Sequence, residues 1–296
     1  MGKPYHVLTN EQIEHFLTRG YVVLHECFSR GAAKSLTDTT FVRLGYDPDE
    51  PSTWHEAVIH MPAHRHIDVK DFAPKVWEAV CDLLGGEERI QQPYRWGDGF
   101  IVNLREGTER PWDPPSPRIK GWHKDGDFFR HFLDSPEQGL LTLVICSDID
   151  SRGGATFVAA DSVPVVARLL AEHPEGILPD NFDHQSLINQ CREFVEATGQ
   201  VGDVYLLHPY VLHAKSQNLL GIPRLITNPP VHLREPMNFN RPDPADFSPV
   251  ELAVLRGLGV ERLDFQPTAP RERVVPARVA RQQKMMEEEQ ARMAQS

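Results

Sequence analysis

The stretch Gly202-Asp203-Val204-Tyr205-Leu206-Leu207-His208-Pro209-Tyr210-Val211-Leu212-His213 combines a turn, an apolar run and two histidines. Gly202-Asp203 is typical of a turn, and the four residues that follow form an apolar run of strand length. His213 closes the segment. We therefore expect a buried strand here, followed by a segment that carries a histidine.

Short apolar runs of the same kind occur on both sides of this stretch, between about Tyr94 and Leu233. Strand-like segments in succession, with few helices between them, are typical of a jelly roll or a similar double sheet. The sequence therefore predicts a mainly β fold, with helical insertions at residues 162–173 and 185–197. The expected strands cover residues 100–104, 140–146, 155–159, 204–207 and 224–228.

The residues before this region predict helices and a strand that flank the sheets. Thr9 and Gln12 have the spacing of a capping box, and they open a predicted helix over residues 8–17. A short strand over residues 21–24 and a second helix over residues 72–84 follow.

After Pro236 the chain turns polar and rich in proline, and it ends in a helix-like stretch over residues 279–293. A solvated or packing helix is the first interpretation of this stretch, and a dimer contact through Met285, Met286 and Met293 is the alternative. No repeat or flexible linker divides the chain, so we expect one domain. Its parts are an N-terminal flank (1–93), a jelly-roll core (94–233) and a C-terminal extension (234–296).

Composition argues against several classes of protein. The 296 residues carry a formal net charge of −11, which argues against a nucleic-acid partner. No apolar run approaches the ~18–20 residues of a membrane helix, and the first residues lack the apolar stretch of a secretory signal. The four cysteines lie too far apart for a disulfide framework or a cysteine zinc site. We expect a cytoplasmic protein, monomeric or homodimeric, whose partner is a small molecule rather than a nucleic acid or a membrane.

A candidate metal site begins in the stretch Gly121-Trp122-His123-Lys124-Asp125-Gly126. On an extended strand, residues i and i+2 point to one face, so His123 and Asp125 can offer a nitrogen and an oxygen to one ion. His213 supplies a third ligand if the fold brings it close. Two histidines and one carboxylate form the facial set that leaves positions open on iron(II). His208 is the alternative to His213 as the third metal ligand. Asp127, directly after Gly126, is a further candidate carboxylate.

Arg224 opens the last predicted strand, a short way beyond His213. Its planar guanidinium can hold one carboxylate of a dicarboxylate as a bidentate pair while the other end of that molecule chelates a metal.

The chain resembles the phytanoyl-CoA dioxygenase family of Fe(II)/2-oxoglutarate-dependent oxygenases in the order and spacing of three features. These are the H-x-D motif, the motif G-D-V-x-x-x-H-x-x-x-x-H and Arg224. Residues 8–23 are similar to that family's opening helix and strand, and residues 151–158 are similar to its mid-barrel turn. The resemblance runs from about residue 8 to residue 233. It implies a double-stranded β-helix (jelly roll, cupin-like) with flanking helices, and Fe(II), 2-oxoglutarate and O2 as cofactors.

The resemblance also implies roles for individual residues. The metal ligands and catalytic residues are His123, Asp125 and His213, because the family's iron ligand is the second histidine of its motif rather than the counterpart of His208. Arg224 is the anchor of 2-oxoglutarate.

Further contacts with 2-oxoglutarate are implied on the neighbouring strands, where Asn103 and Thr142 are the candidates. The family often has a serine or threonine two residues past the distal histidine, but this chain has Lys215 there. Ser216 or Thr227 is a candidate substitute.

The implied reaction couples oxidation of a small molecule to the conversion of 2-oxoglutarate into succinate and CO2. Asp125 argues against halogenation, which needs that ligand absent, and leaves hydroxylation, desaturation or cyclisation open. A secondary-metabolite or amino-acid-like intermediate fits as the substrate as well as or better than an acyl-CoA, whose phosphates call for a basic cluster. The alternatives are an acyl-CoA hydroxylase, a catalytically silent jelly-roll protein that binds a metal or ligand, and a cupin-type manganese or zinc enzyme.

Four histidines, His55, His60, His64 and His66, lie in a proline-interrupted region, and their spacing matches no rigid metal template. Packing or surface exposure is the first interpretation, and contact with substrate is the second. Residues 128–130 follow the H-x-D motif, and they line either the core or a substrate pocket.

Overall fold

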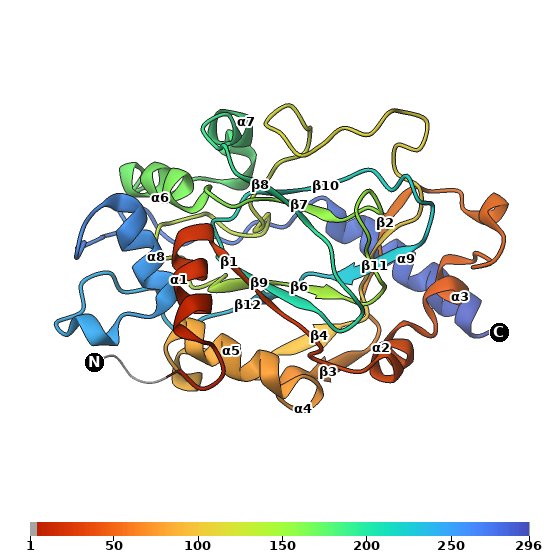
Figure 1. Ribbon diagram of the computed structural model, residues 1–296, viewed down its shortest axis with the longest axis horizontal. Helices are drawn as coiled ribbons and strands as arrows, with labels where there is room; N and C mark the ends of the chain where they lie inside the picture. Colours follow the sequence, from red (N-terminus) through yellow and green to blue (C-terminus); the bar gives the residue numbers. More distant parts are fainter. Residues whose placement is uncertain (1–4, 296) are drawn as a thin grey trace.

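Two facing antiparallel sheets form the centre of the computed structural model, which describes residues 5–295 (Figure 1). The large sheet has the order β1-β9-β6-β11-β5-β2, with β12 beside β6. Its strands are β1 (Tyr21–Leu24), β2 (Val58–His60), β5 (Ile101–Asn103), β6 (Leu140–Ile145), β9 (Val204–Leu207), β11 (Arg224–Thr227) and β12 (Pro230–Val231). The small sheet has the order β10-β7-β8, and its strands are β7 (Thr156–Ala159), β8 (Phe194–Ala197) and β10 (His213–Lys215). A separate pair joins β3 (His66–Asp68) to β4 (Arg95–Gly97).

The chain passes back and forth between the two sheets. Strands β5, β6, β9 and β11 belong to the large sheet, and the segments between them belong to the small one. These segments are the residues around His123, the pair β7 and β8, and β10, because His123 forms a single antiparallel bridge to His213. Such alternation winds a chain into a double-stranded β-helix. The predicted jelly-roll fold with flanking helices is therefore confirmed.

Helices surround this double sheet. In Figure 1, α4 and α5 lie below the large sheet, α1, α6 and α8 gather at one end of the molecule, and α3 and α9 lie at the other. The α-helices are α1 (Asn10–Arg19), α2 (Arg30–Thr37), α3 (Thr40–Leu44), α4 (Val69–Phe72), α5 (Pro74–Leu84), α6 (Val163–Glu172), α7 (His184–Ile188), α8 (Pro249–Leu258) and α9 (Arg278–Met293). Short 3-10 turns are η1 (Pro51–Thr53), η2 (Glu87–Arg89), η3 (Pro179–Asn181) and η4 (Pro244–Asp246).

Local signals placed the first helix correctly. The Thr9 hydroxyl accepts a hydrogen bond from the Gln12 N–H at 3.2 Å, and the Gln12 side chain accepts one from the Thr9 N–H at 2.9 Å. Gly20 ends the helix with φ 73°, a left-handed conformation that glycine adopts without strain. The predicted capping box and strand β1 are confirmed.

Two segments differ from the sequence prediction. The helix expected over residues 185–197 was partly wrong, because only α7 is helical there and Phe194–Ala197 forms β8 against β7. The phenylalanine and valine that open β8 suit a strand, and pairing with β7 satisfies its backbone groups. A second difference is the buried helix α8, because no helix was expected over residues 249–258. It begins at a capping box of Ser248 and Glu251.

The N-terminal flank and the C-terminal extension are both integrated with the jelly-roll core. The flank contributes β1 and β2 to the large sheet. The last helix, α9, packs on α3, where Glu289 forms a buried ion pair with Arg43 at 2.8 Å. A packing role for α9 therefore fits the structure, and its use as a dimer contact stays a prediction.

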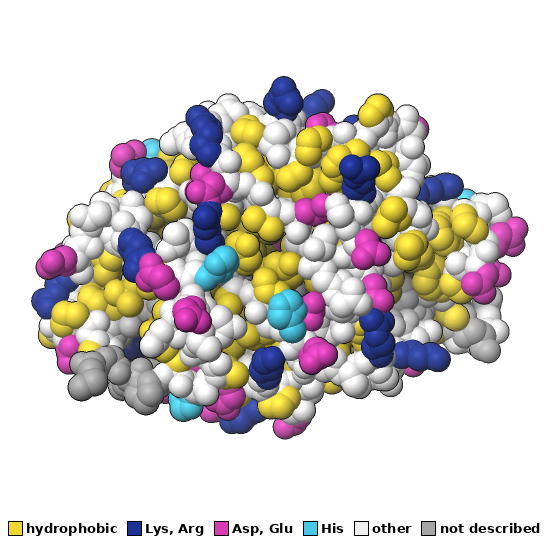
Figure 2. All heavy atoms as spheres, viewed as in Figure 1, with side chains coloured by type: hydrophobic (Ala, Val, Ile, Leu, Met, Phe, Trp, Pro, Cys, Tyr) yellow, Lys and Arg dark blue, Asp and Glu magenta, His cyan; other side chains and the backbone are white. Residues whose placement is uncertain are grey.

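Residues 5–295 contain no helix long and apolar enough to cross a membrane. On the face that Figure 2 shows, Lys and Arg side chains are interspersed with Asp and Glu side chains, and hydrophobic side chains lie between them.

Candidate metal centre

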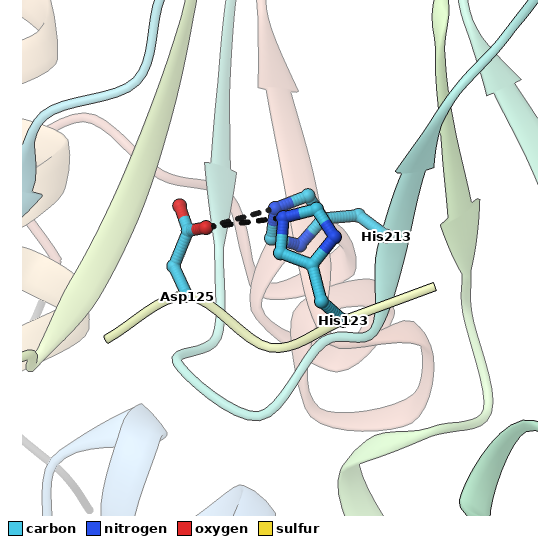
Figure 3. A group of neighbouring side chains, drawn as sticks. All are labelled: His123, Asp125 and His213. Atoms are coloured by element: carbon cyan, nitrogen blue, oxygen red, sulfur yellow. Dashed lines mark ion pairs between the residues drawn. The ribbon is translucent and has the colours of Figure 1, made fainter. Parts of the chain in front are cut away.

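The side chains of His123, Asp125 and His213 point toward one another (Figure 3). One ligand atom from each residue lies within 4.8 Å of the other two. The Asp125 Oδ1 atom is 3.3 Å from the His123 Nε2 atom and 3.4 Å from the His213 Nε2 atom. Among residues 5–295 this is the one group of three such side chains close enough to share an ion. The structure thus brings together the three side chains that the sequence predicted as ligands.

The backbone explains why two segments so far apart in the sequence meet. The His123 N–H donates to the His213 carbonyl at 3.0 Å, and the His213 N–H donates to the His123 carbonyl at 2.9 Å. This bridge places both imidazoles at the edge of the small sheet. The strand expected for H-x-D is reduced to this single bridge, because the chain turns at Gly126 with φ 119°. A Cβ atom at Gly126 would meet His131 and Phe129 atoms at 2.6 Å, so the turn there requires glycine.

Hydrogen bonds fix which nitrogen of each histidine faces Asp125. The His123 Nδ1 atom lies 2.8 Å from the Gly121 carbonyl oxygen, and the His213 Nδ1 atom lies 3.1 Å from the Val211 carbonyl oxygen. A carbonyl only accepts, so each Nδ1 carries a proton, and Nε2 is the atom of each ring that is left to bind a metal. This is the tautomer of a histidine that binds a metal through Nε2.

Asn228 holds the carboxylate, and the sequence analysis did not identify it. Its side-chain amide donates to the Asp125 Oδ2 atom at 2.9 Å, which leaves Oδ1 directed at the two histidines. Asn228 directly follows β11, and it lies two residues from Ile226 and four from Arg224, so the three side chains share one face of the strand. The period of two that places side chains on one face of a strand was therefore a signal that could have found it.

The electrostatics of the group favour a bound cation. Burial alone would raise the pKa of Asp125, but the charges and hydrogen bonds of His213 and His123 hold it well below its usual range. Burial lowers the pKa of His123, yet the hydrogen bond and charge of Asp125 leave that pKa raised overall. The side chain of His123 is 45% exposed, that of Asp125 22% and that of His213 8%, so solvent and ligands reach the group from the His123 side.

Arg224 is a buried cation with an incomplete set of partners. It is 2% exposed, and its guanidinium donates to the Gly154 carbonyl at 2.8 Å and the Ile101 carbonyl at 3.2 Å. No carboxylate of residues 5–295 forms an ion pair with it, and burial lowers its pKa to about 10. It therefore stays charged at neutral pH. Since a buried charge without a counter-ion is costly, the side chain is suited to an anionic ligand.

Arg224 and the metal group share the space between the two sheets. Arg224 lies opposite Asn103 in the ladder of β11 and β5, so their side chains are on the same face of the large sheet. That face looks toward the small sheet, because Arg224 reaches Gly154, just before β7. The two sheets approach so closely there that a Cβ atom at Gly154 would meet the Asn103 side chain at 2.9 Å. We call this face of the large sheet the inner face.

The structure places the other predicted contacts of 2-oxoglutarate differently. Asn103 lies beside Arg224, where its amide donates to the Ser216 carbonyl at 3.0 Å and accepts from the Glu106 N–H at 3.1 Å. The Thr142 hydroxyl instead lies 3.0 Å from the Tyr94 hydroxyl and donates to the Pro229 carbonyl at 2.8 Å.

Neither Thr142 nor Thr227 lies on the inner face. Thr227 follows Ile226, which is on the inner face, so alternation turns Thr227 outward. It pairs with Val144, two residues along β6 from Thr142. The structure therefore does not bring these two threonines to Arg224. The Ser216 hydroxyl donates to the Gln217 carbonyl at 3.3 Å. Lys215 forms an ion pair with Glu106 at 3.2 Å, which neutralises its charge.

The rival metal ligands are engaged elsewhere. His208 is buried against α8, where its Nε2 atom lies 3.2 Å from the Val250 carbonyl and its Nδ1 atom accepts from the Tyr210 N–H at 3.1 Å. Asp127 forms two hydrogen bonds with Arg278 of α9, at 2.6 and 2.7 Å. Neither residue belongs to the group of ligands.

The four clustered histidines separate in space. His55 packs on Tyr46, His64 contacts Glu289 of α9 at 2.8 Å, and His66 lies in the β3–β4 pair. The charges of Asp125 and His123 act on His60, the last residue of β2. Of the residues after H-x-D, Phe129 is buried and packs beside Lys124, whereas Phe128 is partly exposed.

No family model matches the sequence, and no curated protein matches it. Solved structures with a similar chain include the non-heme alpha ketoglutarate dependent epimerase SnoN from nogalamycin biosynthesis, at 17% identity and a TM-score of 0.42, over 74% of this chain and 80% of that one. The carbocyclase SnoK from the same biosynthesis matches at 14% identity and a TM-score of 0.45, over 79% and 87% of the two chains. EctD from S. alaskensis with bound Fe matches at 18% identity and a TM-score of 0.44, over 82% and 84%.

Proposed function

We propose that the protein is a non-haem iron(II) oxygenase that uses 2-oxoglutarate and O2 to oxidise a small molecule. His123, Asp125 and His213 are its metal ligands, and Arg224 holds the distal carboxylate of 2-oxoglutarate. One observation carries the proposal: a facial set of ligands and a buried, unpaired guanidinium share the space between the two sheets.

The ligand set fits iron(II) in number and in kind. Two imidazoles and one carboxylate on one side of an ion leave three positions for a bidentate co-substrate and oxygen. The proton on each Nδ1 directs Nε2 inward, and the Asn228 amide orients Asp125. Such outer partners of metal ligands commonly raise metal affinity about 10–100-fold.

The charges around the site favour a dicarboxylate as co-substrate. Lys215 is neutralised by Glu106, whereas Arg224 forms no ion pair with any carboxylate of the described residues 5–295. A molecule with an oxoacid group at one end and a carboxylate at the other satisfies both the metal and Arg224. When bound, iron(II) and 2-oxoglutarate supply the oxidising chemistry, with succinate and CO2 as co-products.

The residues of the chain set the limits of that chemistry. Asp125 fills the position that a halogenase leaves to halide, so we propose hydroxylation, desaturation or cyclisation rather than halogenation. We propose a secondary-metabolite or amino-acid-like intermediate as the substrate class. The resemblance to the phytanoyl-CoA dioxygenase family is part of the same proposal.

Succinate release that depends on iron(II) and 2-oxoglutarate tests the proposal without knowledge of the substrate. We expect slow release by the wild type in the absence of substrate, and none by Asp125→Ala. The matched control is Asp127→Asn, which changes a carboxylate two residues away that pairs with Arg278. This variant should bind iron(II) and release succinate like the wild type.

Binding of iron(II), measured by calorimetry on the same proteins, separates the possible failures. A wild type that binds iron(II) but releases no succinate under any condition would favour the silent metal-binding protein. Retained turnover in Asp125→Ala would contradict the ligand assignment.

A further inference from the structure

His60 lies on the inner face together with Arg224. In the ladder of β2 and β5 it stands opposite Ile101, and Ile101 stands opposite Ile226 of β11. Residues opposite one another in an antiparallel ladder share a face, and so do residues two apart on one strand. His60 and Ile226 are therefore on the face of Arg224, one side-chain layer further along the sheet.

Charges from both parts of the site act on His60, which the ladder places on the inner face. Burial is the largest cause that lowers its pKa, followed by the positive charges of Arg224 and Lys215, while Asp125 acts in the opposite direction. One histidine thus senses both the proposed anchor and the metal ligands. It is also open to solvent.

The ring of His60 has no partner of its own. No hydrogen bond, ion pair or ring contact joins it to any residue in the described range 5–295. Its charged neighbours other than Arg224 are paired, Lys215 with Glu106 and Asp125 with His123. An imidazole with a lowered pKa is neutral at neutral pH, so it offers one N–H donor and one acceptor nitrogen.

We propose that His60 is a positioning residue for the oxoacid co-substrate, whose carboxylate accepts a hydrogen bond from its imidazole N–H. This inference rests on the proposed function. A molecule that chelates a metal at His123, Asp125 and His213 and pairs with Arg224 runs along the inner face, on which the ring of His60 also lies. The hydrogen bond would hold the chain of the co-substrate against the inner face.

The test measures binding of 2-oxoglutarate to the full-length protein loaded with zinc(II), which is redox-silent, by calorimetry. His60→Ala should weaken binding about tenfold, which corresponds to about 1.4 kcal/mol and is typical of one lost hydrogen bond to a charged group. His60→Gln keeps an N–H donor near the position of Nε2, and it should restore most of the affinity. The matched control is His66→Ala, at the exposed first position of β3, which should bind like the wild type.

A second readout separates positioning from a merely structural role. In the succinate assay, His60→Ala should raise the KM for 2-oxoglutarate and leave kcat nearly unchanged, and its zinc affinity and thermal midpoint should match those of the wild type. Wild-type affinity for 2-oxoglutarate in His60→Ala would overturn the inference and leave the proposed function standing. Absence of 2-oxoglutarate binding by the zinc-loaded wild type would overturn both.

Discussion

Two arginines, Arg43 and Arg224, are almost completely buried, but their surroundings differ. Arg43 in α3 contacts Glu289 at 2.8 Å and Asp98 at 3.3 Å, and it donates to the Asp98 and Pro62 carbonyls. Arg224 in β11 donates to two backbone carbonyls and meets no carboxylate among the described residues. The chain thus supplies both the cation and its anions at one site, and only the cation at the other.

The difference separates a structural role from a binding role. Around Arg43 the charges neutralise one another and fasten α9 to the N-terminal part of the chain. The charge of Arg224 is buried without the carboxylate whose attraction normally offsets the loss of hydration, which is unfavourable for folding. Such a cost is expected where a ligand completes the site, so exposure alone does not tell the two arginines apart.

The largest expected effect comes from Arg43→Met. Removal of this cation leaves the carboxylates of Glu289 and Asp98 buried with fewer partners, which typically costs about 3–5 kcal/mol. Urea unfolding of the metal-free protein should show this loss. The folded variant should still bind 2-oxoglutarate with wild-type affinity, because Arg43 lies outside the site.

A double variant, Arg43→Met with Glu289→Leu, checks the cause. It removes one of the two buried carboxylates that Arg43→Met leaves without a cation, so it should recover part of the lost stability. An equal or greater loss in the double variant would mean that packing of α9, rather than unpaired charge, dominates.

The opposite pattern is expected for Arg224→Met. Loss of the bidentate partner should weaken 2-oxoglutarate binding about 100-fold, or about 2.7 kcal/mol, in the zinc-loaded protein. Stability of the metal-free protein should fall by no more than about 1–2 kcal/mol, because two carbonyls lose a donor while an unpaired charge leaves the interior. A large loss of stability together with unchanged 2-oxoglutarate affinity would show that the two arginines play the same role.

The grouping of His123, Asp125 and His213 and the strand position of Arg224 could be predicted from the sequence, because each belongs to a motif whose spacing carries chemical information. The strands that hold them were also predictable, since short apolar runs are local signals. Asn228 could have been predicted in the same way, because its spacing of four residues from Arg224 puts both side chains on one face of a strand.

Thr142 and His60 show where sequence reasoning ends. The face to which Thr142 points depends on the register of β6 against β9 and β11, which are distant in the sequence. The place of His60 depends on the pairing of a three-residue strand with β5. Register between distant strands is set by packing of the whole sheet, and no local pattern records it.

The smallest expected effect is a difference in pH dependence between the two arginine sites. Burial would raise the pKa of Asp98, but hydrogen bonds from Arg65 and the His64 backbone, with the charge of Arg43, hold that pKa below its usual value. A carboxyl with a lowered pKa stabilises the fold above its unfolded pKa of about 3.9, and this contribution is lost as pH falls through the folded pKa. The stability advantage of the wild type over Asp98→Asn should therefore be constant above about pH 5 and shrink below about pH 4. Urea unfolding across this range measures this advantage.

The corresponding difference in unfolding free energy between the wild type and Arg224→Met should not change with pH over the same range, because Arg224 has no carboxylate partner to titrate. A dependence on pH there would reveal a counter-ion within the chain.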